Sequence, residues 1–239
     1  MKIIDYRNNK DIDVYFTEYK WIFKNTSYQK FKNGGIKCPY ETRYEDRGYI
    51  GEGEYKPCIK NDHTREYDDW KHMLKRVYNE EFHNKYPTYK DCRLYEDWHN
   101  FQIFAKWSNE NYYEVPNQRM CLDKDILIKG NKLYSPDTCI YVPERINCLL
   151  LKCDSHRGKY PIGVTYHKKT SSFNTNLSII TDGKRKRINL GYYQTPVEAY
   201  EVYKRAKENY IKQVADEYRS YIPNELYQAL YKYEVNIND

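Results

Sequence analysis

The sequence predicts an α+β protein built from three parts. A small N-terminal β-module (1–65) precedes a central module of two strands and a helix (66–155), and a three-stranded antiparallel sheet with a helix (156–239) ends the chain. Three observations predict this class. Short segments alternate between apolar and polar residues, apolar residues recur at helical spacing between them, and glycines cluster near the N-terminus.

Composition limits the classes of protein that fit. Apolar residues make up 40% of the 239 residues, which is enough for folded cores, but 29 residues are Tyr, whose hydroxyls need water or a hydrogen-bond partner. The longest aliphatic run, around 146–151, is far shorter than the roughly 18 residues of a membrane span. The polar N-terminus lacks the apolar core of a signal peptide. We therefore expect a soluble cytoplasmic protein with no membrane association.

Cysteine spacing and charge add two expectations. The seven cysteines contain no CxxC pair, which predicts reduced thiols and no structural zinc. The net charge is only +6, but the segment 155–190 has one acid, Asp182, against eight bases: Arg157, Lys159, Lys168, Lys169, Lys184, Arg185, Lys186 and Arg187. Such a patch suits a polyanion, and a plain solvated surface is the alternative.

The N-terminal module is expected to contain five or so short strands. Ile12–Phe16 alternates as a half-buried strand does, and Lys32–Lys37 has two glycines between apolar neighbours, as in a hairpin turn. Gly48–Tyr55 contains three glycines, which indicates tight turns or bulges between strands. No catalytic cluster is evident in this module.

The central module contains two helical stripes followed by a strand–turn–strand–helix pattern. The stripes, which favour a core, consist of Trp70, Met73, Leu74 and Val77, and then Trp98, Phe101, Ile103, Phe104 and Trp107. Strands are predicted at 122–128 and 138–142 with a turn at Gly130. A helix over 143–151 follows, with Pro143 in its first turn.

The C-terminal module has the clearest pattern. Three alternating strands are predicted at Pro161–Lys169, Phe173–Thr181 and Lys186–Tyr193, with Asp182–Gly183 as a hairpin turn. A helix follows over Thr195–Tyr218, capped by Thr195 and Glu198, with an apolar stripe of Ala199, Val202, Tyr203, Ala206 and Tyr210. A short helix and a terminal strand are expected after it.

Alternation divides the predicted sheet into two faces. If Val164, Leu177, Ile179, Ile188 and Leu190 face the helix, the opposite face is wholly polar or basic. It carries Thr165, His167, Lys169, Asn174, Asn176, Ser178, Arg187 and Asn189. Several of these side chains can reach base edges or phosphates. A solvent-facing sheet surface would also be polar.

Residues 160–218 resemble the Apetala/ERF-type DNA-binding domain. The resemblance is carried by Gly163–Val164 in the first strand, Asn189–Gly191 at the end of the third, the segment YYQTPVEA and the helix rich in alanine and tyrosine. It implies that the sheet lies in the major groove of double-stranded DNA, with the helix behind it. That family's face is rich in Arg and Trp, whereas this one is rich in Asn, Ser and Thr.

Residues 67–153 resemble HNH-type endonucleases of phages and prophages. The carrying segments are Trp70–Tyr78, Tyr89–Phe101 and Leu122–Val142, and with the C-terminal module the layout resembles phage homing-endonuclease-like proteins of the bacterial cytoplasm. The resemblance implies a β-hairpin and helix that hold one divalent ion, Mg²⁺ or Mn²⁺.

The HNH resemblance assigns roles to four residues. Asp123 falls on the metal-binding Asp and Asn147 on the metal ligand of the helix, while the catalytic positions hold Lys124 in place of the general-base His and Thr138 in place of the orienting Asn. Lys is a poor base near pH 7 unless its pKa is lowered. Asp125 could add a carboxylate, and His99 is the nearest histidine that could replace the base. Turn and helix capping is the alternative role of Asp123 and Asn147.

Three functions follow as expectations. The first is a metal-dependent DNA endonuclease or nickase held on its target by the C-terminal module. The second is a DNA-binding regulator on a nuclease scaffold that has lost its catalysis. The third is a phage protein that binds and inhibits a host defence protein through its Tyr-rich surface, because Tyr is enriched in interfaces. DNA binding is favoured over cleavage.

Overall fold

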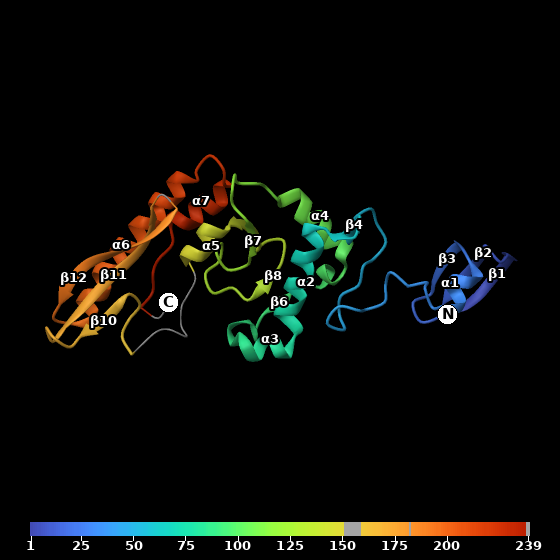
Figure 1. Ribbon diagram of the computed structural model, residues 1–239, viewed down its shortest axis with the longest axis horizontal. Coiled ribbons are helices and arrows are strands. Elements are labelled where there is room, and N and C mark those ends of the chain that lie inside the picture. The colour runs from blue at the N-terminus through green and yellow to red at the C-terminus, as the bar shows by residue number, and fades with distance from the viewer. Residues whose placement is uncertain (151–158, 182, 238–239) are drawn as a thin grey trace. The chain divides into compact units, whose positions relative to one another are not determined.

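The computed structural model describes residues 1–150, 159–181 and 183–237. The chain is mixed α and β (Figure 1) and divides into two compact units. The first comprises Met1–Tyr112 and Gly130–Thr138, and the second comprises Tyr113–Lys129 and Cys139–Asp239. The chain therefore leaves the second unit once to complete the first. No helix among the described residues is long and apolar enough to cross a membrane.

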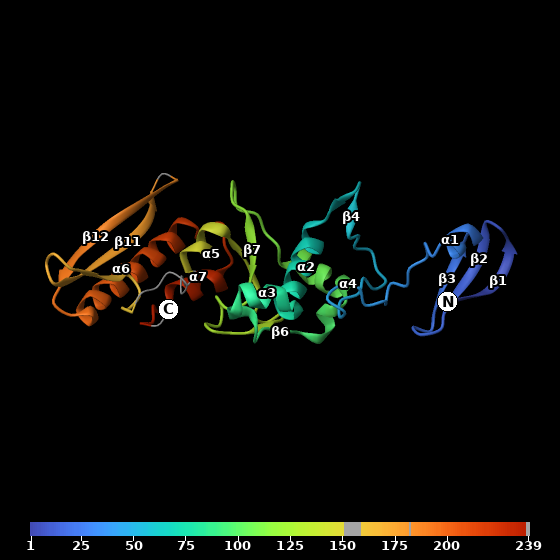
Figure 2. The ribbon, with the colours of Figure 1, turned by 60° about the horizontal axis from the view of Figure 1, so that its bottom comes forward.

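An antiparallel three-stranded sheet in the order β1-β2-β3 begins the first unit (Figure 2). Its strands and the helix after them are β1 (Lys2–Asn8), β2 (Asp11–Phe16), β3 (Trp21–Thr26) and α1 (Tyr28–Lys32). Ile12 and Val14 point to the same face of β2 and are fully buried, packed with Ile36. The predicted alternation of this strand is therefore confirmed.

The glycine-rich segments do not form the expected strands. Lys32–Lys37 is the end of α1 and a turn, in which Gly34 has a φ of 63°. Gly48–Tyr55 forms only isolated bridges and bends, and a Cβ at Gly51 would lie 2.2 Å from the Asn100 side-chain oxygen. Close packing against a side chain and a φ of 73° both favour glycine at this position, which lies outside any strand. The other two strands of the module are instead β4 (Cys58–Ile59) and β5 (Asp62–His63).

Helices α2 and α4 hold the aromatic core of the first unit. Its remaining elements are α2 (Arg65–Tyr78), α3 (Glu80–Lys85), η1 (Pro87–Tyr89), β6 (Arg93–Leu94), η2 (Glu96–His99), α4 (Phe101–Asn111) and β8 (Leu133–Tyr134). Strands β6 and β8 pair in parallel. The predicted face of α2 is confirmed, since all four of its residues are buried. Trp70 also donates its indole N–H to the Trp98 carbonyl at 2.7 Å.

The second stripe is confirmed except at one position. Trp98, Phe101 and Phe104 are fully buried, but Ile103 is 43% exposed. The helix α4 begins only at Phe101, so its buried face continues through Phe104, Ala105 and Ser108 at helical spacing. Ile103 lies off that face.

Two paired strands and a helix begin the second unit. These are β7 (Met120–Asp123) and β9 (Ile140–Pro143), which pair antiparallel, and α5 (Glu144–Leu150). The first strand ends at Asp123, five residues earlier than expected for 122–128, because the Asp123 carboxylate accepts from two backbone N–H groups in the turn that follows. The predicted turn at Gly130 is present, with a φ of 81°, but it does not join the two strands directly, because Gly130–Thr138 belongs to the first unit.

The predicted C-terminal sheet and helix are confirmed. The elements are β10 (Val164–His167), β11 (Ser172–Thr181), β12 (Lys184–Tyr193), α6 (Pro196–Glu217) and α7 (Asn224–Tyr231), and the sheet order is β10-β11-β12, all antiparallel. Thr195 caps α6, because its hydroxyl accepts from the Glu198 N–H at 3.2 Å and the Glu198 carboxylate accepts from the Thr195 N–H at 3.1 Å. The expected terminal strand does not form among residues 232–237.

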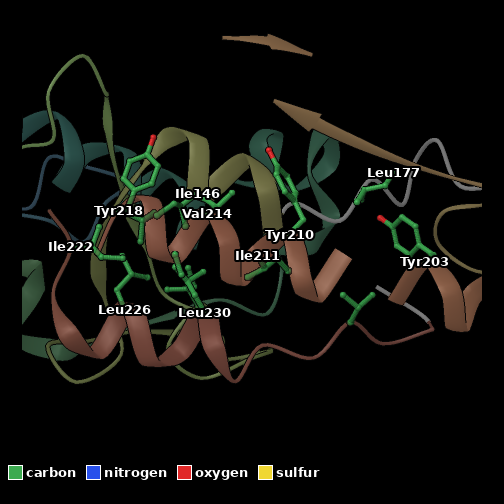
Figure 3. Packing of buried hydrophobic residues seen from close by; sticks show 14 of the residues in the cluster. Ile146, Leu177, Tyr203, Tyr210, Ile211, Val214, Tyr218, Ile222, Leu226 and Leu230 are labelled. Carbon is green, nitrogen blue, oxygen red and sulfur yellow. The ribbon is translucent and has the colours of Figure 1, made fainter. Parts of the chain in front are cut away.

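One core joins the sheet to the helices of the second unit (Figure 3). Leu177 of β11 and Tyr203 of α6 lie on the sheet side, while Leu226 and Leu230 of α7 cover the other side of α6. Ile146 of α5 is fully buried in the same core. Of the predicted stripe of α6, Ala199, Tyr203 and Tyr210 are buried, and Val202 and Ala206 are half-buried. The helix therefore holds one face of the sheet and leaves the other face open.

Candidate functional site

Strand register places the predicted polar residues on the open face of the C-terminal sheet. In antiparallel strands, residues directly opposite each other share a face. Thr165 pairs with Asn174, Asn176 with Asn189, and Ser178 with Arg187. His167 pairs with Ser172, and Lys169 lies exposed in the turn between β10 and β11. Of the five apolar residues of the opposite face, Val164, Leu177, Ile179 and Leu190 contribute to the core of the unit, and Ile188 is half-buried.

A bulge in β12 shifts its register against β11 by one residue. Thr175 pairs with Gly191 and Asn176 with Asn189, so β12 has one extra residue, Leu190, at this point. Gly191 has a φ of 125°, a conformation that favours glycine. The bulge brings the Gly191 N–H and carbonyl next to the asparagines of the open face, where both groups form hydrogen bonds.

Three asparagines of the open face bind one another, and we call them the asparagine network (Asn174, Asn176 and Asn189). Asn174 Nδ2 donates to Asn189 Oδ1 at 3.0 Å and to the Gly191 carbonyl at 3.1 Å. Asn176 Nδ2 donates to Asn174 Oδ1. Asn189 Oδ1 also accepts from the Gly191 N–H at 2.9 Å. The sequence indicated that these residues share a face, but not that they form a network.

Basic and aromatic side chains surround the asparagine network. Arg185 and Arg187 are exposed on the open face, where they pair with Ile180 and Ser178, whereas Lys184 and Lys186 are exposed on the other face of β12. Tyr192, 49% exposed, lies opposite Asn174, and its ring meets the His167 ring edge-on at 5.4 Å. His167 Nδ1 lies 2.9 Å from the Thr170 hydroxyl, so one ring nitrogen is used locally. Of the basic patch predicted from sequence, Arg157 lies outside the described residues, as does the acid Asp182.

Asp123 caps a turn at the end of β7. Its Oδ1 accepts from the N–H groups of Asp125 and Ile126, both at 2.8 Å. Desolvation, together with the negative charge of the Asp125 carboxylate, raises the pKa of Asp123 above the ordinary Asp value. Turn capping, one of the two roles expected for Asp123, is therefore present. Two neighbouring carboxylates are also a feature of many divalent-metal sites.

The other predicted catalytic and metal-binding residues are Lys124, Asn147 and Thr138, and they are divided between the two units. Lys124 is buried, with its Nζ 3.6 Å from a carboxylate oxygen of Asp125. Asn147 is half-buried in α5, which packs against β7 and β9. Thr138 lies in the first unit, where its hydroxyl donates to the Leu133 carbonyl at 2.7 Å. Asp123, Lys124 and Asn147 thus belong to adjacent elements of one unit.

His99 has both ring nitrogens in use. Its Nδ1 lies 2.8 Å from the Glu96 carbonyl, so that nitrogen carries the proton and donates. Its Nε2 then accepts from the Tyr78 hydroxyl at 2.7 Å. The residue is also buried in the first unit. Its hydrogen bonds fix η2 against α2, which is a structural role.

Among the described residues, no group of three or more His, Cys, Asp or Glu side chains could hold a metal ion. No protein-family model, curated protein or solved structure matches the chain.

Proposed function

We propose that the chain binds double-stranded DNA through the open face of the β10-β11-β12 sheet. The observation that carries this proposal is the composition of that face, where the asparagine network lies on the same side of the sheet as the exposed Arg185 and Arg187. Cationic side chains suit phosphates, and amides suit base edges. The helix α6 supports the sheet from behind, so the face is held rigidly.

The shape of the sheet also suits a duplex. Strand β10 pairs only with Ser172–Thr175, whereas β11 and β12 continue together as far as the pair of Thr181 and Lys184. Beyond β10 the sheet is therefore a two-stranded ribbon, and the major groove of B-DNA is wide enough to admit such a ribbon. The four basic residues 184–187 lie on this ribbon, where phosphates on both sides of the groove would meet them.

Salt-dependent binding tests the proposal. Each phosphate contact contributes a slope of about −0.9 to log K against log salt, so Lys169→Ala with Arg187→Ala should flatten the slope by up to about 1.8. The measurement is fluorescence anisotropy of a labelled duplex with the whole chain. Lys106→Ala, an exposed lysine of α4, is the matched control and should leave the slope unchanged. Unchanged affinity and slope in the double variant would show that the sheet is not the DNA face.

Metal-dependent DNA cleavage is the second candidate function. The observation that favours it is the pair of neighbouring carboxylates at the end of β7, Asp123 and Asp125. With Asn147 they would supply oxygen ligands suited to Mg²⁺ or Mn²⁺. Lys124 stands where the resemblance expects the base, so Lys124→His should increase any cleavage.

Supercoiled plasmid with and without Mg²⁺ or Mn²⁺ tests cleavage directly. Asp123→Asn keeps an oxygen that accepts from the turn but removes the charge that a divalent ion needs. It should therefore abolish nicking while DNA binding persists. Nicking that survives Asp123→Asn would refute this metal site. Binding without nicking in the wild type would favour the regulator over the nuclease.

A further inference from the structure

The direction of every hydrogen bond in the asparagine network follows from one backbone group. A backbone N–H can only donate, so the atom of Asn189 that lies 2.9 Å from the Gly191 nitrogen must be the side-chain oxygen. The Asn174 atom near that oxygen also lies 3.1 Å from the Gly191 carbonyl. Both neighbours are acceptors, so this atom must be the Asn174 amide nitrogen.

The same logic orients the third side chain. Since Asn174 presents its nitrogen to Asn189, its oxygen faces Asn176, and Asn176 must present its nitrogen to that oxygen. Two groups then have no part in the network, namely the Asn176 oxygen and the Asn189 amide nitrogen. Neither forms a hydrogen bond with another group in the described part of the chain. The network thus leaves one acceptor and one donor unused, and they belong to directly opposed residues.

We propose that Asn176 and Asn189 together recognise an adenine base in the major groove, an inference that rests on the proposed function. Adenine presents an N6 amino donor next to an N7 acceptor. The Asn176 oxygen can accept from N6, and the Asn189 nitrogen can donate to N7. The contact resembles the bidentate pairing of a single Asn or Gln with adenine, but two residues share it.

The other bases match this pair of groups less well. Guanine presents two acceptors, O6 and N7, so the Asn176 oxygen would face another acceptor. Cytosine presents only its N4 amino donor, which leaves the Asn189 nitrogen without a partner. Thymine presents only the O4 acceptor, which leaves the Asn176 oxygen without a partner. Discrimination from a well-made bidentate contact corresponds to roughly 5- to 150-fold in affinity.

Asn174 is a positioning residue in this arrangement. It is only 9% exposed although it lies on the open face, and its amide is used on both sides by the network. It therefore cannot contact a base itself. Its role is to hold the amide planes of Asn176 and Asn189, so that neither can turn over and exchange its donor for its acceptor.

Asn189→Asp is the sharpest test, because it keeps every bond inside the network. The aspartate still accepts from the Gly191 N–H and from Asn174, but it now presents an acceptor outward. An outward pair of acceptors suits the cytosine N4 amino group. Asn174→Asp instead removes the central donor and should abolish the preference without creating another. Ser178→Ala, on the same face but outside the network, is the matched control.

The experiment selects duplexes from a random-sequence pool with the whole chain and then sequences them. We expect an adenine position with the wild type and Ser178→Ala, a cytosine at that position with Asn189→Asp, and no preference there with Asn174→Asp. A wild-type motif without adenine, or an adenine preserved in Asn189→Asp, overturns the inference. Circular dichroism shows whether each variant is folded. If Asn174→Asp does not fold, the base preference of Asn189→Asp alone tests the inference.

The proposed function and this inference fail in different ways. Retention of the unselected pool is measured first, as a function of salt. If the wild type retains no duplex at any salt concentration, DNA binding itself fails and the inference fails with it. If duplex is retained with a normal salt slope but no adenine position emerges, only the inference fails.

Discussion

Gly163→Ala should destabilise the second unit more than Gly183→Ala does, although both glycines have a positive φ. Gly163 ends the turn that leads into β10 and has a φ of 76°, and its carbonyl accepts from the Thr175 hydroxyl at 2.9 Å. A Cβ added there would lie 2.2 Å from a ring carbon of Tyr203, far inside van der Waals contact. Tyr203 is buried against the core, so its ring would have to shift to admit the added carbon.

The magnitude follows from two separate costs. A side chain in the left-handed region costs about 1–2 kcal/mol, and forcing extra atoms into a packed core costs roughly 1–3 kcal/mol more. Gly183 provides the control, since its φ is 71° and nothing lies within 4 Å of its added Cβ. Gly183→Ala should therefore carry only the first cost. The difference between the two variants isolates the contact with Tyr203.

The free energy of unfolding of both variants is measured by urea titration, with far-ultraviolet circular dichroism as the signal. All four tryptophans lie in the first unit, at positions 21, 70, 98 and 107, so tryptophan fluorescence in the same sample follows that unit as an internal reference. We expect Gly163→Ala to lower the free energy of unfolding by about 2–5 kcal/mol and Gly183→Ala by about 1–2 kcal/mol. Equal losses in the two variants would refute the close approach of β10 to α6.

Three further changes have defined outcomes. Thr195→Ala removes the cap of α6 and should cost about 0.5–2 kcal/mol in urea unfolding, whereas Thr195→Ser should cost little because it keeps the hydroxyl that accepts from Glu198. The pKa of Asp123 is raised in the folded state by desolvation and by Asp125, so stability should fall as pH rises from the ordinary Asp pKa to the raised one. Asp123→Asn should remove that fall in thermal melts recorded between pH 3 and 8. Trp70→Ala should cost about 3–5 kcal/mol by fluorescence-detected unfolding, because the side chain is fully buried.

Local patterns determined much of the C-terminal sheet and helix, and one helix of the first unit, in advance. The alternation of the three C-terminal strands, the capping box at Thr195 and the buried face of α2 depend on residues within one or two turns of each other. Periods of 2.0 and 3.6 residues are properties of the backbone, so short segments show them without knowledge of the fold. The polar face of the sheet could be predicted for the same reason.

Contacts between distant residues decided the rest. Gly51 and Gly53 pack closely against Asn100 and Gln102, and Gly48 packs against Trp70 and Leu74. The segment 130–138 leaves one unit for the other. The direction of the asparagine network depends on a bulge at Gly191, which shifts the register of β12 by one residue. Sequence shows which side chains can donate or accept, but which atoms meet depends on strand register and on backbone groups far along the chain. Only the folded structure brings those groups together.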